Sequence, residues 1–109
     1  DNIGLVTAYA NDVSYDEVFS RQLEDILDKK DLVIAISGSG NSSNVVNAVK
    51  YANEVGAETL AVVGYDGGEL KKISKHFIWI PSFDMQICED IQLMFGHIVA
   101  KKLIVDNMK

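Results

Sequence analysis

Two spacings of apolar residues alternate along the chain, and each predicts a different secondary structure. Short, continuous apolar runs predict strands, whereas apolar residues three or four positions apart predict amphipathic helices. The predicted strands are 32–36, 59–64 and 77–80, and the predicted helices are 14–28, 45–54, a short basic one ending near Lys75, and 85–105. Residues 2–10 fit either a short helix or an extended segment. Strands that alternate with helices predict βαβ units, and therefore an α/β fold with a parallel sheet.

Signals at the ends of these segments support the assignment. Ser14 and Glu17 fit a capping box at the start of the first long helix, and Gly56 fits the stop of the second. The runs 32–36 and 60–63 are apolar at every position. We therefore expect both faces of these strands to be buried.

The last helix, 85–105, is apolar around much of its circumference. Its apolar residues are Ile87, Ile91, Met94, Ile98 and Leu103, together with Cys88, Phe95, Val99 and Ile104. One packing surface needs only one apolar flank. We expect one flank to cover the sheet, and the other to meet a partner subunit or a further segment of chain.

Composition narrows the class of protein. A chain of 109 residues is long enough for one domain with a real core. The net charge of −6 argues against a basic nucleic-acid-binding face, and no apolar run approaches the roughly 20 residues of a membrane span. Cys88 is the sole cysteine, so an internal disulfide is impossible and a cytoplasmic setting fits best.

The segment 37–44 is rich in serine, glycine and asparagine, and it lies between a predicted strand and a predicted helix. The first N–H groups of a helix lack internal partners and carry partial positive charge, which makes an anion site. Its serines add hydroxyl donors. The alternative is that Ser42 or Ser43 only caps the helix. The segment matches neither the Walker A loop nor the dinucleotide-binding fingerprint.

Other polar residues allow more than one interpretation. His97 lies among apolar residues, where a histidine is usually a core or interface residue. Glu89 and Asp90 precede His97 by about two helical turns, so either carboxylate can lie on the same face of the helix as the imidazole. Such a carboxylate and His97 fit an acid–base pair, two metal ligands or an interface salt bridge. From the residues alone, Asn11 and Asp12 are best explained as helix-capping groups at a polar junction.

With its surroundings, the segment 37–42 resembles the SIS (sugar isomerase) domain, and within it the phosphoheptose isomerase group. The resemblance spans almost the whole chain. It includes the Asn11–Asp12 junction, the helix around Phe19 and Arg21, the turn 64–68 and the final helix with His97. It implies a three-layer α/β/α sandwich with a parallel, flavodoxin-like sheet. It also implies that residues 1–109 are the C-terminal portion of a single SIS domain, because the family has a helical region, a strand and a Gly-rich loop before this point.

The resemblance further implies a reaction and a site. The family interconverts sedoheptulose 7-phosphate and a heptose 7-phosphate through an enediol, with a glutamate and a histidine moving protons, often beside zinc. By resemblance, the phosphate is held by Ser37, Ser39 and Ser42, and the substrate is contacted by Asn11, Asp12 and Glu89. His97 is the expected catalytic histidine and, with Glu89, the expected zinc ligand. A homo-oligomer, dimer or tetramer, is expected as well.

Three positions depart from the family pattern. Gly38 stands where the family usually has threonine, Glu89 where it has glutamine, and Gln92 where it has a second histidine. The catalytic glutamate and the other zinc ligands of the family belong to the region before this chain's first residue. These departures leave open a non-catalytic phosphosugar-binding module, acting as a regulatory sensor or protein-interaction domain, or a domain that serves only in assembly.

Overall fold

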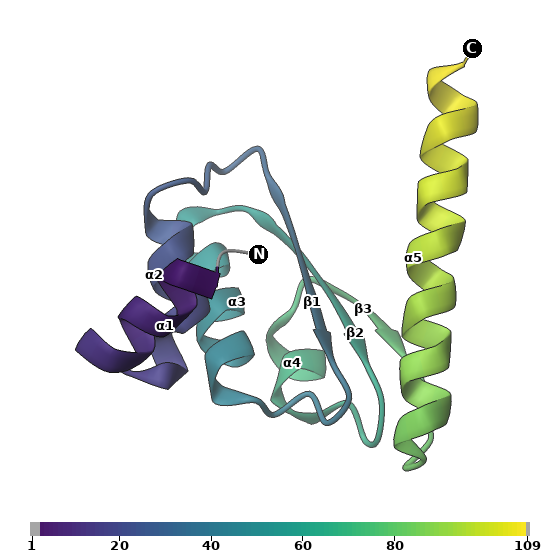
Figure 1. Ribbon diagram of the computed structural model, residues 1–109. Coiled ribbons are helices and arrows are strands. Elements are labelled where there is room, and N and C mark those ends of the chain that lie inside the picture. The colour runs from purple at the N-terminus through teal and green to yellow at the C-terminus, as the bar shows by residue number, and fades with distance from the viewer. Residues whose placement is uncertain (1–2, 109) are drawn as a thin grey trace.

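The computed structural model describes residues 3–108, which form a three-stranded parallel sheet with helices on both of its faces (Figure 1). The strands are β1 (Leu32–Ser37), β2 (Glu58–Val63) and β3 (His76–Trp79), hydrogen-bonded in the order β1-β2-β3. The helices are α1 (Ile3–Asp12), α2 (Val18–Glu24), α3 (Ser43–Val55), α4 (Gly68–Ile73) and α5 (Met85–Asn107), with a 3₁₀ turn η1 (Tyr15–Glu17). The predicted α/β class and parallel sheet are confirmed.

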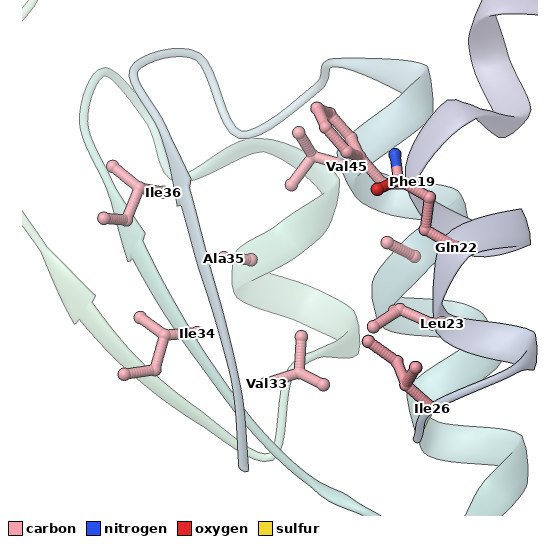
Figure 2. Close-up of a pocket in the computed structure, with 10 residues that line it drawn as sticks. Phe19, Gln22, Leu23, Ile26, Val33, Ile34, Ala35, Ile36 and Val45 are labelled. Carbon is pink, nitrogen blue, oxygen red and sulfur yellow. The ribbon is translucent and has the colours of Figure 1, made fainter. Parts of the chain in front are cut away.

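Helices α3 and α4 cover one face of the sheet, and α2 packs against α3 (Figure 1). The core of this layer consists of Ala35, Val46, Val49, Ala61, Val63 and Leu70. Figure 2 shows Val33 and Ala35 of β1 directed toward the helices, whereas Ile34 and Ile36 are directed away from them. This alternation follows from the period of two in a strand.

The opposite face is covered only in part, by α5. Cys88 of α5 is buried against Val62 of β2 and Ile80, and it is the one fully buried residue of that helix. On β1, Leu32, Ile34 and Ile36 remain 55%, 44% and 53% exposed. The expectation that β1 is buried on both faces is therefore wrong for the described residues, because α5 lies over the β2 side of the sheet.

The first long helix differs from the prediction at its start. The Ser14 hydroxyl accepts from the Asp16 N–H at 3.1 Å and caps η1. The Glu17 carboxylate accepts from Arg21 Nε at 2.9 Å, so it does not complete a capping box. The predicted box is wrong because an i, i+4 ion pair takes the carboxylate.

The same helix also ends earlier than predicted, at Glu24 rather than at Asp28. The Asp31 carboxylate accepts from the Asp28 N–H at 2.8 Å, and the Asp28 carboxylate accepts from the Lys30 N–H at 2.9 Å. Aspartate side chains that bond nearby N–H groups compete with the helical backbone. This turn then leads into β1.

The N-terminal segment and the second helix follow their signals. Of the two possibilities for 2–10, the structure shows a helix, α1, although residue 2 itself lies outside the described residues. Gly56 ends α3 in the left-handed conformation, with φ of 91°, as predicted. Among the described helices, none combines the length and apolarity needed to cross a membrane.

Candidate functional site

The serine loop, residues 37–42, joins the carboxyl end of β1 to the first turn of α3. Ser37 is the last residue of β1, and Ser42 is the N-cap of α3. Gly40 turns the loop with φ of 72°, a conformation that glycine adopts without a steric penalty. The loop thus lies where ligands bind in parallel α/β sheets.

Two serine hydroxyls are held in place by backbone N–H groups of the loop itself. Ser37 Oγ accepts from the Gly40 N–H, and Ser39 Oγ accepts from the Asn41 N–H, both at 3.1 Å. A hydroxyl that accepts in this way keeps its own O–H proton for another partner. Ser37 and Ser39 are therefore oriented donors, and Ser37 is itself buried.

The hydroxyls of Ser42 and Ser43 do not cap α3. Ser42, at the N-cap, makes no side-chain cap hydrogen bond, and in residues 3–108 neither hydroxyl is used in a hydrogen bond. Asn44 Oδ1 instead accepts from the Val45 N–H at 2.8 Å. Capping does not account for these two serines, and both hydroxyls are exposed at the positive end of the helix.

A second loop, residues 64–67, packs directly on the serine loop together with the first turn of α4. The Gly64 N–H donates to the Gly38 carbonyl, and the Leu70 N–H donates to the Gly40 carbonyl, both at 2.9 Å. A Cβ on Gly40 would collide with the Gly67 carbonyl. Both loops follow neighbouring parallel strands, so they form one surface at this edge of the sheet.

Of the charged residues in the adjoining segment 64–71, Asp66 and Glu69 are acidic, and the Lys71 ammonium lies 3.7 Å from the centroid of the Trp79 ring. Asp66 accepts from the Gly68 N–H at 3.0 Å, and Glu69 lies in the first turn of α4. Arg21 is held by Glu17, whose hydrogen bond and charge raise the pKa of the guanidinium. An anion in the loop would be held by hydroxyls, backbone N–H groups and the helix dipole.

The structure does not bring Asn11 and Asp12 to the serine loop through a hydrogen bond. The Asn11 amide donates to Asp12 Oδ1 at 3.0 Å, and both residues are exposed at the end of α1. Neither side chain caps a helix in the described chain, so the capping interpretation is not supported. Their predicted contact with substrate remains a prediction.

Glu89 and His97 both lie exposed on α5, so His97 is not a core residue of this chain. Met85, at the start of α5, adjoins Gly38, and His97 follows twelve residues later, or about 18 Å along the helix axis. Glu89 and His97 are about 12 Å apart by the same measure. Within one chain, His97 is not beside the serine loop.

The residues present do not by themselves fit a zinc ion. Among residues 3–108, no three His, Cys, Asp or Glu side chains are grouped so that they could hold a metal. Protein zinc sites commonly use three or four such ligands. The expected pair of Glu89 and His97, two turns apart on α5, would supply at most two of these ligands, and its role as a zinc site remains a prediction.

A family model for the SIS domain matches residues 3–64, more than half of the chain. The chain belongs to the SIS domain family. Its relatives include the phosphoheptose isomerase of Aliarcobacter butzleri, 40% identical over 102 residues, which are 94% of this chain and 53% of the relative. The probable phosphoheptose isomerase of Thermoplasma volcanium is 42% identical over 106 residues, 97% of this chain and 53% of the relative. This SIS domain chain thus spans about half the length of these relatives.

Comparison with solved structures agrees with this family assignment. The chain matches the phosphoheptose isomerase from Neisseria gonorrhoeae with a TM-score of 0.85 and 31% identity, over 88% of this chain and 55% of that one. A phosphoheptose isomerase from Francisella tularensis matches with a TM-score of 0.88 and 21% identity, over 92% and 56%, and supports the fold alone. The predicted α/β/α sandwich of the SIS fold is confirmed as a partial one.

Gly38, one of the departures from the family pattern, has a close neighbour in the structure of this SIS domain. A Cβ built on Gly38 would lie 2.7 Å from Met85 Sδ and 2.9 Å from its Cε. The thioether of Met85 therefore occupies the space that a side chain at position 38 would need. Sequence reasoning noted the lost hydroxyl at Gly38 but missed Met85, because no local pattern links residues so far apart.

A hollow in the described chain lies away from the serine loop. It is an apolar groove of about 550 Å³ between α2, β1 and α3 (Figure 2). Its lining residues are Phe19, Gln22, Leu23, Ile26, Val33, Ile34, Ala35, Ile36, Val45 and Ala48. Because Gln22 is the only polar residue of that lining, the groove does not suit a phosphate.

Proposed function

We propose that this SIS domain is the phosphate-binding part of an enzyme that interconverts sedoheptulose 7-phosphate and a heptose 7-phosphate. The observation that carries the proposal is the serine loop, where hydroxyls with unused protons stand at the N-terminus of α3. The names of the relatives supply the substrate class. The whole enzyme's activity is inferred, since the chain spans about half of those relatives.

In this proposal the serine loop binds the phosphate at one end of the sugar. Ser37, Ser39 and Ser42 donate O–H groups to phosphate oxygens, and the first N–H groups of α3 add to them. The isomerisation moves one proton between C1 and C2 and another between the two oxygens, through an enediol, so that atoms balance. The reacting carbons lie at the far end of the sugar from the phosphate, and so the acid and base act away from the loop.

His97 is the proposed proton carrier, with Asn11, Asp12 and Glu89 as proposed substrate contacts. Because His97 is about 18 Å along α5 from the end that touches the loop, another segment or subunit must complete the site. We include a homo-oligomer in the proposal, since Ile98 and Leu103 of α5 are 63% and 56% exposed. Exposed apolar surface of this kind is typical of an interface.

Turnover of sedoheptulose 7-phosphate by the full-length protein tests the proposal. We expect Ser39→Ala to raise KM and His97→Ala to lower kcat, since the first residue binds phosphate and the second moves a proton. A full-length protein that does not turn over this substrate would refute the isomerase assignment. Normal turnover by His97→Ala would remove His97 from the mechanism.

A non-catalytic phosphosugar-binding module is the second candidate. The observation in its favour is that, among the described residues, no three His, Cys, Asp or Glu side chains are grouped so that they could hold a metal near the serine loop. Titration calorimetry of the full-length protein with sedoheptulose 7-phosphate separates the two candidates. Binding without turnover supports a sensor or interaction module, and turnover supports the enzyme.

A further inference from the structure

The side chain of Asn41 joins the serine loop to α4. Its Oδ1 accepts from the Glu69 N–H at 2.8 Å, across 28 positions of sequence. The N-cap of α4, Gly67, has no side chain and makes no cap hydrogen bond. Asp66 accepts from the Gly68 N–H, and Asn41 supplies, from another loop, the acceptor for the next N–H group of α4.

The backbone of the same residue holds a phosphate-site hydroxyl. The Asn41 N–H donates to Ser39 Oγ at 3.1 Å, so residue 41 contacts Ser39 on one side and α4 on the other. The packing here is tight, because a Cβ on Gly68 would lie 2.5 Å from the Ser39 carbonyl and 2.7 Å from Asn41 Oδ1. Movement of the Asn41 side chain would therefore disturb the Ser39 hydroxyl.

We propose that Asn41 is a positioning residue of the phosphate site, acting through the Ser39 hydroxyl and the adjoining first turn of α3. This inference rests on the proposed function. Without the Asn41 acceptor, the Glu69 N–H loses its partner and the serine loop gains conformational freedom. Phosphate binding must then order the loop, and its affinity falls.

Asn53 provides a matched control at the other end of α4. Its Nδ2 donates to the Ile73 carbonyl at 2.9 Å, and its Oδ1 accepts from Thr59 at 3.0 Å. Asn53→Ala therefore removes a long-range polar contact of α4, as Asn41→Ala does, but away from the serine loop. A purely structural role for Asn41 would make the two variants behave alike.

The experiment measures kcat and KM for sedoheptulose 7-phosphate, and inhibition by inorganic phosphate, in the full-length protein. We expect Asn41→Ala to raise KM and the phosphate inhibition constant roughly three- to tenfold, as the loss of one hydrogen bond implies, with kcat little changed. Asn53→Ala should lower the thermal midpoint without changing KM. Equal KM values for wild type and Asn41→Ala, or equal KM increases in both variants, would overturn the inference.

A second variant covers the case in which Asn41→Ala does not fold. Asn41→Asp keeps an acceptor for the Glu69 N–H but adds a negative charge at the loop. We expect near-normal thermal stability and a raised KM that added salt partly relieves, since salt screens the repulsion of the phosphate. An unchanged KM would contradict the inference. A wild-type protein that neither binds phosphate nor turns over sedoheptulose 7-phosphate would instead refute the proposed function.

Discussion

Replacing Gly38 by alanine tests the contact between the serine loop and α5. The φ of Gly38 lies outside the left-handed region, so alanine is compatible with the backbone there. In open space such a change stabilises a protein by about 0.4–1 kcal/mol, because it restricts the unfolded chain. In this chain the new methyl group would lie 2.7 Å from Met85 Sδ, closer than any real contact.

The size of the destabilisation by Gly38→Ala depends on how readily the Met85 side chain can move. Inserting a methyl group into a packed site costs about 1–3 kcal/mol. Met85 is flexible and 39% exposed, so we expect the lower end of that range. Offset by the backbone gain, Gly38→Ala should lower the free energy of unfolding by about 0.5 kcal/mol.

In a Met85→Ala background the obstruction is gone, and the same change should raise the free energy of unfolding by about 0.4–1 kcal/mol. The effect of Gly38→Ala thus reverses sign, with a coupling energy of about 1 kcal/mol between the two sites. Urea unfolding of the four proteins of this cycle, at constant protein concentration, measures it. Equal effects of Gly38→Ala in both backgrounds would refute the contact between Gly38 and Met85.

Four further substitutions test the core, the helix caps and the exposed helix α5. Leu70→Ala should destabilise the protein by about 2–5 kcal/mol in urea unfolding, because Leu70 is fully buried between α4 and the sheet. Asp84→Ala should lower the free energy of unfolding by about 0.5–2 kcal/mol, since Asp84 Oδ1 accepts from the first N–H groups of α5. Ser42→Ala should change the free energy of unfolding by less than about 0.5 kcal/mol, because the Ser42 side chain makes no cap hydrogen bond, and should still weaken phosphate binding in calorimetry. Ile98→Glu, at a 63% exposed position, should lower the mass measured by light scattering if α5 joins copies, and an unchanged mass would exclude that position from an interface.

Local patterns were enough to predict most of the fold. The alternation of strands and helices, and the position of the serine loop after β1, follow from spacings within a few residues. Gly56 ends α3 as predicted, because its left-handed conformation is a property of one residue. The position of the serine loop is predictable for the same reason, since its serines lie within one short segment.

Features that depend on distant residues were not predictable in this way. The capping of α4 by Asn41 joins positions 28 residues apart, and the contact between Gly38 and Met85 spans a longer interval. The exposed face of β1 escaped prediction because Ile34 is as apolar as a buried residue, and only the placement of α5 leaves it uncovered. His97 is likewise exposed because of where α5 lies.

The proposed site therefore has two parts, which are held in place by different contacts. The serine loop follows β1, the 64–67 loop follows the adjacent β2, and hydrogen bonds from Gly64, Glu69 and Leu70 join this second loop and α4 to the serine loop. The proposed phosphate-binding part is therefore built within residues 37–70. His97 belongs to α5, which meets the rest of the chain through Met85, Cys88, Gln92 and Phe95 in its first three turns, before the position of His97. In the proposed enzyme, phosphate recognition would therefore depend on contacts that this chain makes with itself, whereas proton transfer would depend on the segment or subunit that covers α5. Substitutions in 37–70 should thus act on affinity, and those along the exposed faces of α5 on assembly and turnover.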